Sequence, residues 1–188
     1  MLKKIAVTLS IALIATLMAC GRLNTPTQPG EARADLIGPE GQLVGTATLS
    51  ETDEGVKLEL DLVNMPPGEH GFHIHETGEC APPDFQSAGG HLALAGQSHG
   101  FDTGKGPHLG DLPNLTVAAS GSAEIHQTVD GATLGGGDRS LMNRAIVIHA
   151  KPDDYKSQPS GAAGARIACG VIEAGFALPV TTRPFPVH

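Results

Sequence analysis

Five of the nine histidines in this 188-residue chain fall between positions 73 and 108, and clustered imidazoles are typical of metal sites. His73 and His75 lie two residues apart in the segment GFHIHE. In a β-strand this spacing puts both imidazoles on one face, roughly 7 Å apart at the backbone, so the pair could bind one ion. His149 ends the apolar segment RAIVIHA and could add a third imidazole. These three nitrogens with a shared fourth would suit copper.

A second group of potential ligands lies in the long polar stretch that follows GFHIHE. It contains His91 in SAGGHL, His99 in GQSHG, and His108 with Asp111 in GPHLGDL. Asp111 lies three positions after His108, so one loop could fold its ligands around one ion. Together with His91, these residues supply three nitrogens and one carboxylate oxygen, a tetrahedral set suited to zinc.

Alternating hydrophobicity indicates that strands, rather than helices, position these ligands. The clearest strand is 56–62, in which valine and leucine alternate with lysine, glutamate and aspartate, and no segment shows sustained helical periodicity. The eight expected strands are 32–37, 43–50, 56–62, 70–76, 114–119, 122–129, 144–149 and 166–173. The sequence therefore predicts an all-β fold, an eight-stranded antiparallel Greek-key sandwich or flattened barrel. The stretches 77–113 and 150–165 lack strand pattern and should form two long functional loops.

The composition favours a strand-rich fold and excludes one class of partner. The chain has 25 Gly and 14 Pro but only 5 Phe, 1 Tyr and no Trp, which favours many turns over a helical bundle. Its formal net charge is -8, and it becomes -10 when residues 1–19, with two lysines and no acid, are left out. We do not expect so acidic a chain to bind nucleic acid.

The first 19 residues are interpreted as a secretory signal peptide, with two lysines ahead of an apolar run too short to span a bilayer. Cys20, in the segment LMAC, resembles the lipidated cysteine of a bacterial lipobox. The alternatives are plain secretion with cleavage nearby and a retained transmembrane helix. Residues 20–31 would form a lipidated N-terminus and flexible tether. We expect export to the cell envelope, in the periplasm or at the cell surface, with a membrane anchor on Cys20.

Cysteine usage fits an exported chain. There are three cysteines and no CxxC pair, so a cysteine zinc site or a thioredoxin-like redox site is not supported. If Cys20 carries lipid, Cys80 and Cys169 remain, and in an oxidising compartment they could pair in only one way. Such a disulfide would close a loop of about 90 residues and contribute about 4–5 kcal/mol on the chain-entropy estimate.

Over about residues 32–174 the chain resembles the copper/zinc superoxide dismutases of the bacterial, exported type. The resemblance rests on five segments in this order: GFHIHE, SAGGHL, HLGDL, VIHAKPDD and GARIACGVI. It implies a copper ion bound by His73, His75, His91 and His149. It also implies a zinc ion bound by His91, His99, His108 and Asp111, with His91 bridging the two ions as an imidazolate.

The same resemblance implies a disulfide between Cys80 and Cys169 and an active-site Arg166. The loop before Arg166 holds one cation, Lys156, as a candidate helper in attracting an anionic substrate. The C-terminal tail, 175–188, lies beyond the resemblance.

Asp153 matches the family's aspartate that links a copper-ligand histidine to a zinc-ligand histidine, here His73 and His99. A partner for the second ring nitrogen fixes the tautomer and orientation of such a ligand. The histidines that match no ligand position are interpreted as ordinary polar residues: His70, His126 and His188.

The activity that the resemblance implies is dismutation of superoxide to molecular oxygen and hydrogen peroxide at copper, which would protect the cell envelope. Zinc would shape the site without redox change, and His91 would be both ligand and proton carrier. The alternatives are a lipoprotein that buffers copper or zinc, and a zinc hydrolase, which needs an open zinc position. Superoxide would be the small-molecule substrate, and the sequence is compatible with a monomer or a homodimer.

Overall fold

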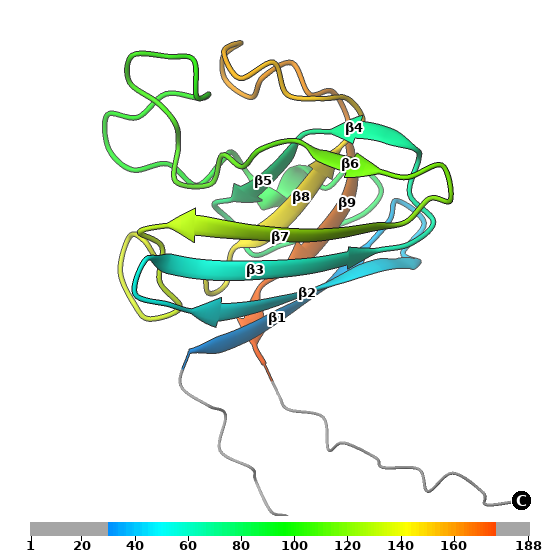
Figure 1. Ribbon diagram of the computed structural model, residues 1–188, viewed down its shortest axis with the longest axis horizontal. Coiled ribbons are helices and arrows are strands. Elements are labelled where there is room, and N and C mark those ends of the chain that lie inside the picture. Colours follow the sequence, from blue (N-terminus) through cyan, green and yellow to red (C-terminus); the bar gives the residue numbers. More distant parts are fainter. Residues whose placement is uncertain (1–29, 176–188) are drawn as a thin grey trace, which may run out of the picture.

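Ten β-strands and one short 3₁₀ helix form the part of the chain that the computed structural model describes, residues 30–175 (Figure 1). The strands are β1 (Glu31–Ile37), β2 (Leu43–Glu51), β3 (Gly55–Leu62), β4 (Gly68–His70), β5 (Phe72–His75), β6 (Leu115–Val117), β7 (Ala123–Asp130), β8 (Ala145–His149), β9 (Arg166–Val171) and β10 (Glu173–Ala174). The helix η1 covers Gln86–Ala88.

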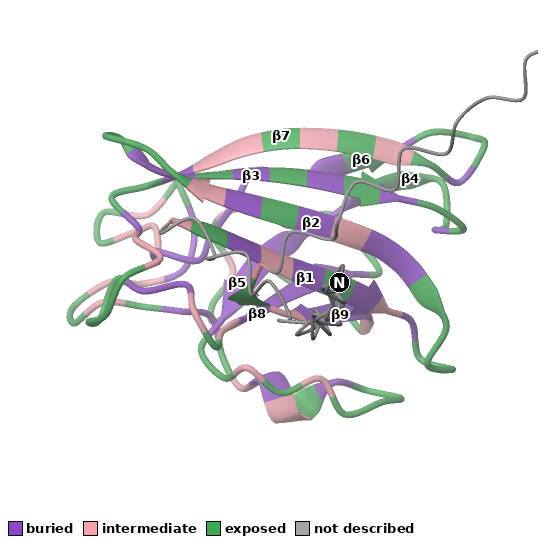
Figure 2. Ribbon diagram, turned by 90° about the horizontal axis from the view of Figure 1, so that it is seen from below, coloured by how far each residue is buried: buried purple, intermediate pink, exposed green. Residues whose placement is uncertain are grey.

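Period-two patterning explains how the strands face the interior. In β3 the valine and leucine side chains are buried, and Lys57, Glu59 and Asp61 between them are exposed. Figure 2 shows the same alternation as bands of buried and exposed residues along β1, β2 and β3. One face of these strands therefore lies on the core and the other faces water.

The strands pair in a Greek-key order. The main sheet runs β5-β8-β9-β1-β2-β3-β7 with β10 paired to β1, and β4 and β6 form a separate pair. Every pair of named strands is antiparallel. In Figure 1 the main sheet curls strongly, so that β5, β8 and β9 pass behind β7, β3 and β2. The expected all-β antiparallel Greek-key fold is confirmed.

Two of the eight expected strands are each divided into two shorter strands that pair with different partners, so the structure has ten strands. The expected strand 70–76 breaks at Gly71, where β4 pairs with β6 and β5 pairs with β8. A Cβ at Gly71 would lie 2.8 Å from the Cβ of Ala163, so only a residue without a side chain fits this crossing. The expected strand 166–173 likewise divides into β9, paired with β8, and β10, paired with β1.

β5 and β8 are buried on both faces. Their isoleucines, with Phe72, point into the main apolar core, which also contains leucines of β1, β2 and β3. Val147 of β8 points the other way and packs in a small cluster with Phe85 and Cys169. The outer face of β5 and β8 is therefore covered by loops, and this covered face is where the histidines lie.

The long loops after β5 and after β8 lie on the same side of the sheet and contact each other (Figure 1). The backbone N–H of Asp102 donates to the carbonyl of Tyr155 at 3.1 Å, and that of His99 donates to Gln158 Oε1 at 3.1 Å. Among residues 30–175, no helix has the length and apolar character needed to cross a membrane.

Candidate metal centre

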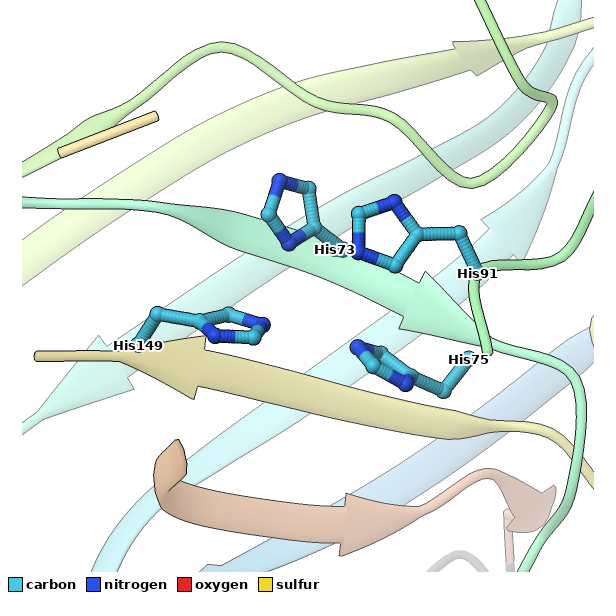
Figure 3. Close-up of side chains that lie close together, drawn as sticks. All are labelled: His73, His75, His91 and His149. Atoms are coloured by element: carbon cyan, nitrogen blue, oxygen red, sulfur yellow. The ribbon is translucent and has the colours of Figure 1, made fainter. Parts of the chain in front are cut away.

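The outer face of β5 carries His73 and His75 side by side. His149 at the end of β8 and His91 in the loop complete a group of four buried imidazoles (Figure 3). Pairing of β5 with β8 and an isolated bridge between His75 and His91 bring them together. Each residue offers one ring nitrogen, and these four nitrogens all lie within 4.8 Å of one another. We call these residues the four-imidazole group.

Hydrogen bonds leave one nitrogen of each ring free to face the centre of this group. His73 Nε2 donates to Asp153 Oδ2 at 2.8 Å. His75 Nδ1 donates to the carbonyl of Gly89 at 3.0 Å, and His149 Nδ1 donates to another backbone carbonyl at 3.2 Å. In these four rings the buried nitrogens without a partner are His73 Nδ1, His75 Nε2, His91 Nε2 and His149 Nε2. Buried polar atoms of this kind need a partner, and four converging imidazole lone pairs fit a copper ion.

Burial keeps three of these imidazoles, those of His73, His75 and His149, neutral. It lowers the pKa of His73 to about 4, of His149 to about 3 and of His75 to about 2. For His73, the hydrogen bond to Asp153 opposes this lowering of the pKa. A metal ion requires deprotonated ligands, so these rings are ready to bind one at neutral pH.

A second convergence of ligand atoms centres on one carboxylate oxygen of Asp111. Asp111 Oδ1 lies 2.7 Å from His91 Nδ1 and 3.0 Å from His99 Nδ1. His108 Nδ1 lies 3.4 Å from the same oxygen. Asp111 Oδ2 accepts hydrogen bonds from the backbone N–H groups of Gly100 and His108 at 2.8 and 3.0 Å. Three nitrogens and one oxygen around one point match the ligand preference of zinc, and we call this set the Asp111 group.

The chemistry of His99 supports a cation in the Asp111 group. His99 Nε2 lies 3.0 Å from Asp153 Oδ1, and a neutral ring that donates there keeps a lone pair on Nδ1. That lone pair faces Asp111 Oδ1, so a cation or a second proton must lie between them. Burial alone would lower the pKa of His99, but hydrogen bonds with Asp111 and Asp153 outweigh it and raise the pKa. Burial opposes ionisation of Asp111 too, yet hydrogen bonds from His91 and His99 hold its pKa well below the usual range.

His91 belongs to both groups. Its Nδ1 faces Asp111, and its unpaired Nε2 lies among the imidazoles of β5 and β8. The ring centroid is 4.0 Å from that of His73 and 4.9 Å from that of His75. One imidazole thus offers a ligand atom to each of two adjacent points.

Asp153 joins the two groups from the side away from these points. Its Oδ2 accepts from His73 at 2.8 Å and its Oδ1 accepts from His99 at 3.0 Å. The backbone N–H of Tyr155 also donates to Oδ1, at 2.6 Å. Burial alone would raise the pKa of Asp153, but these hydrogen bonds outweigh it and lower the pKa to about 2. An ionised carboxylate therefore holds one histidine of each group.

Cys80 and Cys169 form a disulfide with Cα atoms 5.6 Å apart, which confirms the pairing expected from the resemblance. The disulfide ties the loop after β5 to β9, whose first residue is Arg166. Arg166 Nη1 donates to the carbonyl of Phe85 at 2.6 Å and Nη2 donates to that of Gly89 at 2.7 Å. Lys156 lies exposed on the loop 150–165.

His70, interpreted from the sequence as an ordinary polar residue, is buried and engaged by two backbone carbonyls. It is only 3% exposed, and its ring nitrogens lie 2.8 Å from the carbonyl oxygens of His149 and Pro66. The burial of His70 depends on its contact with the carbonyl of His149, 79 positions later, so no local sequence pattern indicated it. His126, in contrast, is exposed on β7 between two glutamates.

Several expectations fall outside the described residues. The signal peptide over 1–19, Cys20 with most of its tether, and His188 belong to this part of the sequence. Of the tail 175–188, only Gly175 is described.

The geometry defines a class of protein, an antiparallel Greek-key β-protein with two adjacent metal-binding groups that share one histidine. The profile of the family described as copper/zinc superoxide dismutase matches residues 43–172, and the chain belongs to this family. It is 45% identical over 151 residues to superoxide dismutase (Cu-Zn) 2 of Aquifex aeolicus, covering 78% of this chain and 88% of the relative. It is 43% identical over 148 residues to superoxide dismutase (Cu-Zn) of Caulobacter vibrioides, covering 76% and 85%.

Solved structures show the same fold. A SOD-like protein from Bacillus subtilis aligns with a TM-score of 0.71 at 39% identity, over 74% of this chain and 96% of that one. The Cu/Zn superoxide dismutase from Brucella abortus aligns with a TM-score of 0.65 at 30% identity, over 76% and 99%. The protein is therefore an oxidoreductase of the superoxide dismutase family, whose metals are copper and zinc, and both of its ligand groups could hold a metal ion.

Proposed function

We propose that this protein dismutates superoxide at a copper ion held by the four-imidazole group, beside a zinc ion held by the Asp111 group. The copper ligands would be His73, His75, His91 and His149. The zinc ligands would be His91, His99, His108 and Asp111. The observation that carries this proposal is the convergence of buried ring nitrogens without hydrogen-bond partners on two points that share His91. Four of these nitrogens belong to the four-imidazole group, and the fifth is His108 Nδ1 in the Asp111 group.

Bound copper would supply one-electron redox chemistry, by which one superoxide is oxidised to oxygen and a second is reduced, with two protons, to hydrogen peroxide. His91 is the proton carrier in this scheme, because its Nε2 faces the copper position while Nδ1 is engaged on the Asp111 side. Zinc is d¹⁰ and adds no redox step, so the Asp111 group serves to hold His91 in place.

Arg166 would bind the superoxide anion at the copper mouth. Two of its N–H groups donate to loop carbonyls, and a guanidinium has five such donors, so others remain for an anion. Local positive charge is needed because the chain has a formal net charge of -8, which repels an anion at long range.

The two alternative functions fit the described site less well. A protein that only buffers metal has no need of Arg166 beside the histidines. A zinc hydrolase needs an open coordination position, whereas the Asp111 group offers four protein ligands within 4.8 Å of one another. Dismutation uses all the features of the site.

Variants at the shared and unshared ligands test the assignment. His91→Ala should weaken zinc binding, alter the visible spectrum of bound copper and lower activity together, because it removes a ligand from both groups. Asp111→Ala removes a ligand from the Asp111 group only, so it should weaken zinc binding before copper binding is affected. His126→Ala, on the exposed face of β7, is the matched control and should change neither metal. Loss of copper with unchanged zinc affinity in His91→Ala would show that His91 does not bridge.

We further propose that the protein is exported and anchored at the cell envelope, which it would protect from superoxide. The support is the segment before Cys20, with two lysines, an apolar run and no acidic residue. Cys20→Ser should move the protein from the membrane pellet to the soluble fraction without changing dismutation per bound copper. A wild-type protein that is soluble and retains a free Cys20 thiol would contradict the anchor.

A further inference from the structure

The side chain of Asn114 forms a two-point contact with the main chain of Asp153. Asn114 lies three residues after Asp111 and directly before β6. Its Nδ2 donates to the carbonyl of Asp153 at 2.9 Å, and its Oδ1 accepts from the N–H of Asp153 at 2.8 Å. The amide thus pairs with Asp153 as a neighbouring strand would.

These contacts satisfy both main-chain polar groups of Asp153. Among the described residues, no backbone–backbone hydrogen bond involves the N–H or the carbonyl of Asp153. Asp153 is only 4% exposed, so both groups would be costly to leave without a partner. The Asn114 side chain therefore takes the place of a backbone partner for Asp153, and it links the start of β6 to the loop 150–165.

The carboxylate of Asp153 has little freedom once its main chain is fixed. Both oxygens are engaged, by His73 on one side and by His99 and the Tyr155 N–H on the other. Gly161 closes the remaining side, since a Cβ there would lie 1.7 Å from Asp153 Oδ1. A shift of the Asp153 main chain would therefore move the carboxylate relative to both imidazoles.

Asn114 itself is held in the same cluster. Its backbone N–H donates to the hydroxyl oxygen of Tyr155 at 2.8 Å, and the Tyr155 ring packs edge-on against Phe101 at a centroid distance of 5.4 Å. Phe101 and Asp111 both belong to the loop that carries the Asp111 group. Asn114 therefore connects the two long loops at the point where the Asp153 carboxylate spans the metal-binding groups.

We infer that Asn114 is a positioning residue for both metal-binding groups: it holds the main chain of Asp153, and Asp153 in turn orients the rings of His73 and His99. The inference rests on the proposed function, because it assumes that these rings bind copper and zinc. Partners that orient ligating histidines typically change metal affinity by about 10- to 100-fold when they are replaced.

A double-mutant cycle tests this role in the full-length chain, stripped of metal and titrated with zinc against a chromophoric chelator at pH 7. Asn114→Ala and Asp153→Ala should each lower zinc affinity by about 10-fold or more. The double variant should bind zinc about as well as Asp153→Ala alone, because Asn114 acts through Asp153. The electron paramagnetic resonance spectrum of bound copper should also shift in the same direction in both single variants, since both release His73.

Further variants separate positioning from packing. Asn114→Asp keeps the shape but places an oxygen against the Asp153 carbonyl, so it should lose zinc affinity much as Asn114→Ala does. Gln127→Ala, a partly buried amide on β7, is the matched control and should leave zinc affinity unchanged. If Asp153→Ala does not fold, Asp153→Asn replaces it in the cycle, because the amide keeps the volume of the carboxylate.

Additive losses in the double variant, with wild-type zinc binding intact, would overturn the inference alone and show that Asn114 supports the loop by a separate route. Unchanged zinc affinity in Asn114→Asp and Asn114→Ala would overturn it as well. A wild-type chain that binds no zinc would overturn the proposed function together with this inference.

Discussion

His75 and Arg166 donate hydrogen bonds to the same acceptor, the carbonyl oxygen of Gly89. His75 Nδ1 lies 3.0 Å from it and Arg166 Nη2 lies 2.7 Å from it. Gly89 belongs to the segment that the disulfide of Cys80 ties to β9. One short segment therefore orients both a member of the four-imidazole group and the cation beside it.

Arg166 should govern how fast superoxide reaches the copper. Arg166→Ala should lower the rate constant severalfold with both metals bound, and Arg166→Glu should lower it further, since focused charge changes association rates by roughly 10- to 1,000-fold. Added salt should slow the wild-type enzyme because it screens the attraction. Pulse radiolysis at several ionic strengths measures both effects. A wild-type rate in a fully metallated Arg166→Glu protein would mean that Arg166 only supports the loop carbonyls.

The disulfide should stabilise the fold and the metal site together. Reduction of Cys80 and Cys169 opens a loop that spans 89 positions in the unfolded chain, which costs about 4–5 kcal/mol of stability on the chain-entropy estimate. In the folded protein it should loosen the segment whose carbonyls accept from Arg166 and His75. We expect a lower unfolding temperature and faster copper loss to a chelator in reduced protein. Calorimetry and chelator competition on oxidised and reduced samples measure these changes. Equal copper retention in both samples would show that the segment keeps its position without the disulfide.

The metal-free protein should lose stability as the pH falls from about 6.5 towards 4. The folded-state pKa values of His73 and His149, about 4 and 3, lie below the ordinary histidine value because of burial. The unfolded chain then binds more protons in this range, so the free energy of unfolding falls by up to about 1.4 kcal/mol per pH unit for each such histidine. The raised pKa of His99 changes stability only above about pH 6.5, because below that value both the folded and the unfolded chain hold the proton on His99.

Denaturant unfolding of metal-free protein at pH 7.5 and pH 5 measures this loss. His149→Gln should reduce the difference between the two pH values, whereas His126→Ala, at an exposed position, should not. Equal stability at both pH values would contradict the assignment of these rings as neutral buried groups.

Local pattern was enough to predict those features of the fold that follow from strand geometry. The alternation in β3 indicated which side chains are buried, and the spacing of His73 and His75 placed both on one face, because side chains alternate along a strand. Residue types and spacing suggested a zinc set and three copper ligands, and the resemblance to a family added His91 as the fourth copper ligand, since the pattern alone does not say how a loop folds back. Residues 91, 99, 108 and 111 lie in such a loop.

The residues that sequence reasoning missed act through contacts distant in sequence. His70 contacts a carbonyl 79 positions away, and Asn114 contacts the main chain of a residue 39 positions away. Gly89 contributes only its carbonyl, which no side-chain pattern reveals. The division of one expected strand at Gly71 has a similar origin, because the partner strands that compete there are far apart in the chain.

Dismutation at the four-imidazole group is tested most directly by measuring superoxide consumption by the full-length, zinc-loaded protein as copper is added, with both metals counted in the same samples. We expect no activity with zinc alone and a rate that rises in proportion to bound copper up to one copper per chain. Copper bound at the four-imidazole group without superoxide consumption above that of the zinc-only protein would contradict dismutation at this group and favour a metal-buffering function.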